Sequence, residues 1–197
     1  MRLFCKLKIR ILEESWRLWT PIAKIGFWLN NVSFGKNIKV FGIVHIYNKE
    51  GKITVGNNVT INSASWANPT GFSTITTLRT IGKSKIIIGN NVGISNSHIS
   101  AADEVIIGSN TLIGCGCNIM DTDFHPLLAS ERRDEGNTGG KSAVHIGQNC
   151  FLGAGVTVLK GVHIYNGSVI GAGAVLAHDV KEQEVWAGNP ARKVRIL

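Results

Sequence analysis

A strict six-residue interval dominates the C-terminal half of this sequence. Six aliphatic residues occupy it without a break: Ile146, Leu152, Val158, Ile164, Ile170 and Leu176. An α-helix repeats every 3.6 residues and a strand every two, so neither element alone produces this period. A fixed period of this kind is typical of a solenoid, in which short repeats stack on one another.

Each unit starts with an aliphatic residue, continues through turn residues and has a small residue at its fifth position. The fifth positions hold Cys150, Val156, Val162, Ser168, Ala174 and Val180. One unit can form a short strand and a bend, so three units make a triangular coil of 18 residues, stacked about 4.8 Å from the next by parallel strand pairing. We expect both positions to fill the interior, which makes Cys117 and Cys150 packing residues.

Departures from the period divide the chain. Residues 1–31 precede the repeats and form an amphipathic helix in this interpretation, and the repeats extend over 32–181. The period breaks at 63–85 and again at 125–143, where charged residues and two adjacent glycines occur. We predict irregular or protruding loops at both breaks. Residues 182–197 form a tail after the last repeat.

The net charge of +8 is concentrated near the N-terminus. The first 39 residues carry eight Lys and Arg residues and two Glu, a local charge of +6. This distribution favours an anionic membrane surface or an acidic ligand near the helix, and it argues against a nucleic-acid groove along the solenoid. Leu3, Leu7 and Ile11 share one face of the predicted helix, which would cap the solenoid or contact another subunit, touch a membrane surface, or do both.

The cysteines indicate a reducing compartment. Cys5, Cys115, Cys117 and Cys150 show neither a disulfide framework nor paired zinc-ligand spacing. The sequence shows no cleavable signal, and its apolar segments are too short to span a bilayer. We therefore expect a cytoplasmic protein, either free or held at the inner face of the membrane by its N-terminal helix.

Two motifs accompany the repeats, IMDTDFHP at 119–126 and VWAGNPARKVRIL at 185–197. Together with the repeats they resemble the hexapeptide-repeat acyltransferases, from about Lys36 to the C-terminus. The resemblance is greatest to galactoside, maltose and serine acetyltransferases and to bacterial enzymes that acetylate the sugars of capsules and exopolysaccharides. It implies a mainly β fold, a left-handed parallel β-helix, against the usual right-handed crossover. It also implies a homotrimer with shared active sites and acetyl-CoA as the cosubstrate, with no metal.

The resemblance makes His125 the catalytic base. A thioester is already activated, so acyl transfer to a hydroxyl needs a group that accepts the hydroxyl proton. An imidazole titrates near neutral pH and suits that task. Asp123 or Asp121 would hold the second ring nitrogen and fix the tautomer, although both also fit as solvated turn residues. Asn96, about one and a half coils earlier, and Phe151 are candidate acceptor contacts.

The resemblance also implies which residues contact acetyl-CoA. Small side chains would line the pantetheine arm, and arginines would neutralise the nucleotide phosphates through paired hydrogen bonds. These residues are Ala154, Ala172, Ala177, His178, Arg192 and Arg195, with Lys193 as an alternative to Arg195. The chain departs from the family at Ala177-His178, where relatives have Thr-Lys, and at Phe151, where relatives often have Trp.

Three other functions stay open from the sequence. An amino-sugar acceptor would make the protein an N-acetyltransferase. A carbonic-anhydrase-like β-helix would bind zinc through histidines, and His145 and His163, 18 residues apart, would stack on one outer face, but the closely spaced His pair of such sites is missing. A non-catalytic scaffold would bind partners on its regular faces, yet it would need neither the His125 loop nor the tail.

Overall fold

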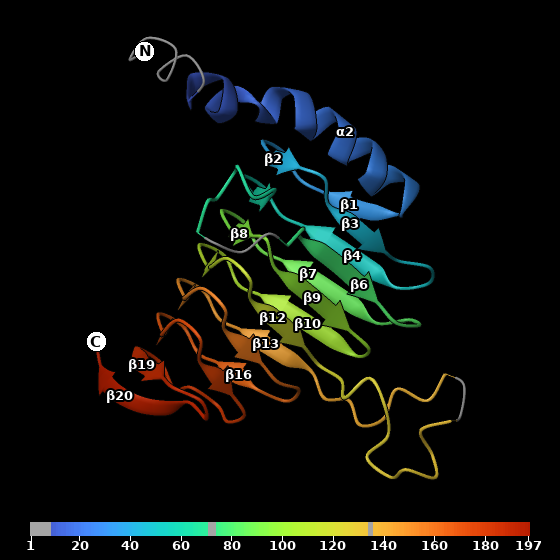
Figure 1. Ribbon diagram of the computed structural model, residues 1–197, viewed down its shortest axis with the longest axis vertical. Coiled ribbons are helices and arrows are strands. Elements are labelled where there is room, and N and C mark those ends of the chain that lie inside the picture. Colours follow the sequence, from blue (N-terminus) through green and yellow to red (C-terminus); the bar gives the residue numbers. More distant parts are fainter. Residues whose placement is uncertain (1–8, 71–73, 134–135) are drawn as a thin grey trace.

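Three sheets surround one core, with a helix at one end and an antiparallel strand pair at the other (Figure 1). The structure is a computed structural model that describes residues 9–70, 74–133 and 136–197. The chain is mainly β with one N-terminal helical segment, as the six-residue period predicts. The left-handed sense of the coil stays a prediction.

Each coil gives one short strand to each sheet. Sheet A contains β1 (Val32–Phe34), β4 (Lys52–Val55), β7 (Lys85–Ile88), β10 (Glu104–Ile107), β13 (Val144–Ile146) and β16 (His163–Ile164). Sheet B contains β2 (Lys39–Gly42), β5 (Thr60–Ser63), β8 (Gly93–Ser95), β11 (Leu112–Ile113), β14 (Phe151–Leu152), β17 (Val169–Ile170), β19 (Glu184–Ala187) and β20 (Arg192–Ile196). Sheet C contains β3 (His45–Tyr47), β6 (Thr77–Thr80), β9 (His98–Ala101), β12 (Asn118–Met120), β15 (Thr157–Val158) and β18 (Val175–Leu176). These strands pair in parallel, except that β19 and β20 are antiparallel.

The strand register confirms the 18-residue coil. Phe151 pairs with Val169 and Thr157 with Val175, each 18 residues further along the chain. The six aliphatic residues of the period are at most 1% exposed, and the six fifth-position residues at most 2%. Both positions therefore fill the interior. Burial raises the pKa of Cys117 to about 11, so this thiol is a neutral packing group, as predicted.

Asparagines at the corners between sheets A and B form a side-chain ladder. The amide of Asn37 donates to Asn58, that of Asn58 to Asn91, and that of Asn91 to Asn110, at 3.2, 2.9 and 2.8 Å. All four adopt the left-handed backbone, with φ between 54° and 60°. Asparagine tolerates this conformation better than most residues, so it suits both the bend and the ladder.

The helix α2 (Trp16–Leu29) closes the N-terminal end of the β-helix. Ala23 and Phe27 are buried against the first coil, and the backbone N–H of Val40 donates to Oγ1 of Thr20 at 2.9 Å. The predicted cap is therefore confirmed for this segment. Residues 9–14 are also helical, whereas residues 1–8, with part of the predicted helix, lie outside the described residues.

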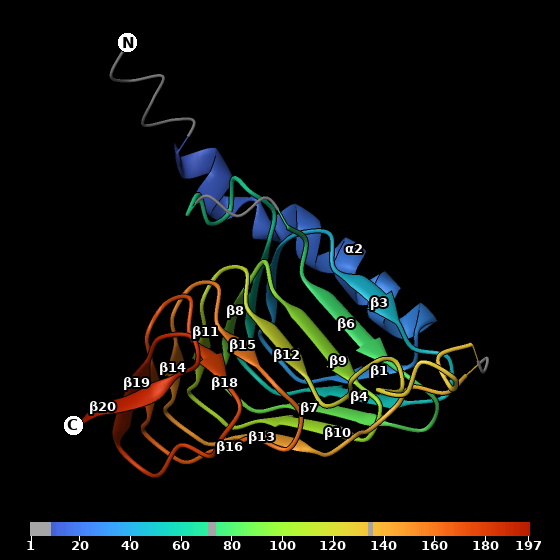
Figure 2. The same cartoon turned by 60° about the horizontal axis from the view of Figure 1, so that its bottom comes forward.

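The two breaks in the period are insertions that leave the sheets, but the first is shorter than the predicted 63–85, because strand β6 lies within that range. Residues 64–76 connect β5 to β6, and residues 121–143 connect β12 to β13. The coils stack across the second insertion, since Val105 of β10 pairs with Val144 of β13. Figure 2 shows this insertion projecting on one side of the molecule and β20 lying on the opposite side.

Phe27→Ala should lower the free energy of unfolding by about 3–5 kcal/mol, because removing a buried aromatic ring leaves a cavity beneath the cap. Trp28→Ala is the matched control: its ring is 74% exposed, and we expect a change below about 0.5 kcal/mol. Urea unfolding of both variants measures the difference. Equal losses would contradict a cap anchored by Phe27.

Candidate active site

His125 lies just outside the β-helix, on the outgoing arm of the 121–143 loop. Its imidazole is exposed and forms no hydrogen bond with the described part of the chain. Both ring nitrogens can therefore meet a substrate or a second protein group, as a general base requires.

The two arms of this loop pair at its base. Thr122 forms an antiparallel bridge with Lys141. The backbone N–H of Asp123 donates to the carbonyl oxygen of Gly140 at 3.0 Å. These contacts fix the direction of the arm that carries His125, although the described residues of the loop form no strand.

Gly139, on the returning arm, lies directly against the backbone of His125. Its φ is +69°, and a Cβ atom added there would stand 2.4 Å from the carbonyl oxygen of His125. Glycine alone permits both the left-handed backbone and this close approach without strain. The returning arm therefore sets the position of the His125 backbone.

Asp121 lies beneath the loop, away from the imidazole. Its two carboxylate oxygens accept the backbone N–H groups of Ala102 and Asp103, at 2.6 and 2.8 Å. Burial raises the pKa of Asp121, and the N–H donors oppose that rise. Asp121 is thus a buried anchor that ties the start of the loop to the preceding coil, and its proposed contact with His125 is not made.

Asp123 also has a partner other than His125. Its Oδ2 atom forms an ion pair with the ammonium group of Lys160, which follows β15 in the next coil. This pair ties the His125 arm to the body of the β-helix. The sequence did not indicate Lys160, because its 37-residue separation from Asp123 carries no local pattern.

The two candidate acceptor contacts differ in accessibility. Asn96 is fully buried at the bend between β8 and β9, with a φ of 42°. Its side chain is therefore closed to an acceptor, contrary to expectation, because the bend turns it inward. Phe151 is exposed on the outer face of sheet B, where it pairs with Leu112, so it stays a candidate.

The four small or neutral residues expected to contact acetyl-CoA lie at two corners of the last coils. Ala154 and Ala172 occupy neighbouring coils at the corner between sheets B and C. Ala177 and His178 follow β18 at the next corner, from which the His125 loop departs in an earlier coil. All but the half-buried Ala154 are exposed. The three alanines present little side-chain bulk at both corners.

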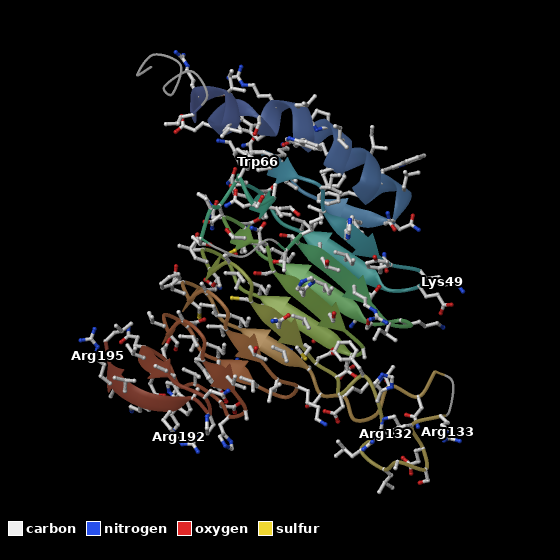
Figure 3. All side chains as sticks on the ribbon, viewed as in Figure 1. Lys49, Trp66, Arg132, Arg133, Arg192 and Arg195 are labelled. Atoms are coloured by element: carbon white, nitrogen blue, oxygen red, sulfur yellow. The ribbon has the colours of Figure 1, made fainter. Side chains whose placement is uncertain are left out.

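Arg192 and Arg195 lie on the exposed strand β20 (Figure 3). Neither forms an ion pair with any described residue. Lys193 between them pairs with Glu184 at 2.6 Å, and this contact, with the Trp186 Nε1–H donor, holds the pKa of the Glu184 carboxyl below its ordinary value. The arginines, rather than Lys193, are therefore the cations available to an anionic ligand.

The His125 loop and these arginines are far apart within one chain. Figure 3 shows Arg132 and Arg133, which belong to the loop, on one side of the molecule, and Arg192 and Arg195 on the other. The turned view in Figure 2 shows the same separation of the loop from β20.

In the described ranges, no group of three or more His, Cys, Asp or Glu side chains is placed to hold a metal ion. His145 and His163 do stack on the outer face of sheet A, with ring centroids 5.5 Å apart. His145 also faces Glu104 at 3.3 Å, and the ring of His163 stacks on Tyr165 at 4.0 Å. Glu104, His145 and His163 therefore form a group of neighbouring side chains on the outer surface of sheet A.

Known sequences match the repeats. Residues 143–177 match the family described as the hexapeptide repeat of succinyl-transferase, which confirms the predicted repeat type. A protein of Escherichia coli strain K12, provisionally named a lipopolysaccharide biosynthesis O-acetyl transferase, is 35% identical over 125 residues. The match covers 60% of this chain and 64% of that relative, so the chain spans less than two thirds of it.

Solved structures share the fold. A mutant N-acyltransferase from Bacillus cereus, in complex with dTDP-4-amino-4,6-dideoxyglucose and coenzyme A, has a TM-score of 0.64 at 20% identity and covers 90% of this chain and 88% of its own. A hexapeptide-repeat acetyltransferase of Vibrio cholerae O1 biovar eltor, complexed with acetyl coenzyme A, has a TM-score of 0.55 at 20% identity, covering 98% and 84%. These likenesses confirm the predicted fold class.

Gly139→Ala should displace the His125 backbone, because a left-handed non-glycine residue costs about 1–2 kcal/mol and the new methyl group meets the His125 carbonyl. We expect a shifted NMR signal for the His125 imidazole. Gly136→Ala is the control: its φ of +81° adds the same backbone cost, but a Cβ atom there meets nothing within 4 Å. Equal shifts in both variants, or none in Gly139→Ala, would contradict the role of Gly139.

Proposed function

We propose that the protein transfers an acetyl group from acetyl-CoA to a hydroxyl group of a sugar or polysaccharide precursor. The observation that carries this proposal is the exposed His125 imidazole, held on a loop by Gly139 and by the Asp123–Lys160 pair. Ala177 and His178 lie two coils further on, at the same corner between sheets C and A from which that loop departs. The acetyltransferase names of the relatives support the same reaction class.

His125 acts as the general base in this mechanism. It accepts the proton of the acceptor hydroxyl as that oxygen forms a bond to the acetyl carbon. The carbon–sulfur bond of the thioester breaks, and the proton passes from the imidazole to the departing sulfur. Acetyl-CoA supplies the activated acetyl group, so no covalent intermediate on the protein is needed.

The residues at the last coils fit acetyl-CoA as a ligand. Arg192 and Arg195 have no acidic partner among the described residues and can bind phosphates. Ala154, Ala172 and Ala177 present little bulk to a pantetheine arm, with His178 next to them. Since these arginines lie opposite the His125 loop, we propose a homotrimer in which one subunit supplies the loop and a neighbour supplies the arginines.

We further propose that the N-terminal helix attaches this cytoplasmic protein to the inner, anionic face of a membrane. The side of α2 opposite Phe27 exposes Leu18, Ile25 and Leu29, which are 64%, 61% and 66% accessible. An apolar face of this kind, beside Lys and Arg, is typical of helices that lie in the membrane surface. In the part of the chain that the structure describes, no helix is long and apolar enough to cross a membrane.

The charges of α2 favour a lipid surface over a second copy of the helix. Arg17 and Lys24 are seven residues apart and share one flank of the apolar face, and Trp28 is exposed at the C-terminal end of the helix. A second copy would bring like charges together, whereas anionic lipids attract each Lys or Arg near the surface by about 1 kcal/mol.

His125→Ala should lower kcat by about 10²–10⁴-fold and leave the KM for acetyl-CoA nearly unchanged, because the imidazole serves proton transfer. Thiol release that depends on the sugar, together with the mass of the acceptor product, measures the reaction. His163→Ala, on the outer face of sheet A, is the control and should retain activity. Undiminished turnover in His125→Ala would contradict the mechanism, and acetylation of amino sugars alone would indicate N-acetyl transfer.

A Leu18→Asp/Ile25→Asp double variant should bind anionic vesicles at least about tenfold more weakly, because both apolar contacts with the lipid are lost. Co-sedimentation with phosphatidylcholine vesicles, with and without phosphatidylglycerol, measures binding. Leu128→Asp removes an exposed apolar side chain in the 121–143 loop and should bind as the unmodified protein does. Equal binding of the unmodified protein to vesicles with and without phosphatidylglycerol would count against membrane attachment. Light scattering that shows the double variant as a monomer would also count against it.

A further inference from the structure

The outer face of sheet C carries a hollow of about 690 Å³, here called the sheet C hollow. Strands β3, β6, β9 and β12 form its floor. The residues that line it are Tyr47, Thr77, Arg79, His98, Ser100, Asn118, Ile119, Met120 and Phe124, and the Ile119 side chain points into the core. The hollow lies within one chain and shares no lining residue with the corners assigned to acetyl-CoA.

The strand register builds this floor. Thr77, His98 and Asn118 pair in one row across the sheet, and Arg79 and Ser100 pair in a second row two residues further on. Side chains alternate between the faces of a strand, so the residues between these rows, such as Leu78 and Ile99, are buried in the core. The polar side chains of the hollow therefore stand on a rigid, packed support.

The hollow also reaches the candidate active site. Phe124, which lines it, directly precedes His125 in the chain. The guanidinium carbon of Arg79 lies 5.8 Å from the centroid of the Phe124 ring, within cation–π range. A molecule bound on this face would thus lie next to the loop that carries the catalytic base.

The lining has the chemistry of a site for a sugar. The hydroxyls of Tyr47 and Ser100, the amide of Asn118 and the imidazole of His98 can each donate and accept hydrogen bonds, as sugar hydroxyls do. Arg79 is the one permanently charged residue among the described residues that line the hollow, and it forms no ion pair with any described residue. Its guanidinium can bind a carboxylate or a phosphate through two parallel hydrogen bonds.

We infer that the sheet C hollow binds the acceptor, and that this acceptor is a sugar with an anionic group held by Arg79. The inference rests on the proposed acetyl transfer and adds the location and the charge of its second substrate. A uronic acid and a sugar phosphate present the same chemistry to Arg79, and the experiment separates them.

The test measures binding without acetyl-CoA, so it is independent of turnover. Titration of the protein with glucose, glucuronic acid and glucose 1-phosphate, followed by NMR, gives the three affinities. We expect at least one anionic sugar to bind about tenfold or more tightly than glucose, and Arg79→Gln to abolish that difference. Lys49→Gln removes one positive charge from the exposed turn after β3 and should preserve it.

Tyr47→Ala provides a second variant that leaves the charge of the hollow unchanged. We expect this variant to bind each of the three sugars more weakly and to keep the preference for an anionic sugar. The inference is overturned if the unmodified protein shows no anionic preference, or if Arg79→Gln retains that preference. It is also overturned if Arg79→Gln converts an oligomer into monomers in light scattering, because the hollow would then be a subunit interface.

Discussion

Backbone hydrogen bonding between successive coils is the constraint on which the rest of the structure depends. Each short strand satisfies its N–H and C=O groups with the coils on either side, so no strand is stable alone. The interior of each coil must therefore be filled by residues of fitting size at fixed positions. Ile164 and Ser168 illustrate this requirement, since both are fully buried although one is aliphatic and the other is polar. The buried hydroxyl of Ser168 is satisfied because it donates a hydrogen bond to the carbonyl oxygen of Lys181 at 2.8 Å.

In this stack of coils, the parts that support the structure are separate from the residue proposed to act in catalysis. The sheets hold the outward rows of polar side chains in register, whereas His125 stands on a loop that the stack only anchors. Asp121 and the Asp123–Lys160 pair connect the loop to two different coils, one before it and one after it. Among the described residues, the carboxylates of Asp121 and Asp123 thus hold the loop in place, and neither is hydrogen-bonded to the His125 imidazole.

The six-residue period was sufficient to predict the coil, the buried positions and where both interruptions begin, because each depends on spacing along the chain, but it missed the return of the chain to sheet C at β6. It could not predict the partners of Asp121 and Asp123, since those depend on which coils become neighbours and on how far each side chain reaches. Asn96 shows a further limit: its place in the sequence was compatible with a surface contact, but the left-handed bend buries its side chain. The sheet C hollow could not be predicted from the period either, because its rows combine residues from four coils.

The unbroken pairing of β10 with β13 has an evolutionary consequence. The 121–143 loop leaves and rejoins the stack between two coils that remain hydrogen-bonded to each other. The loop can therefore lengthen, shorten or change sequence while the stability of the scaffold is largely preserved, since the closure entropy of a loop varies slowly with its length. Substrate preference can then diversify by insertion and deletion at one point in the chain, because such changes affect the stability of the fold only slightly.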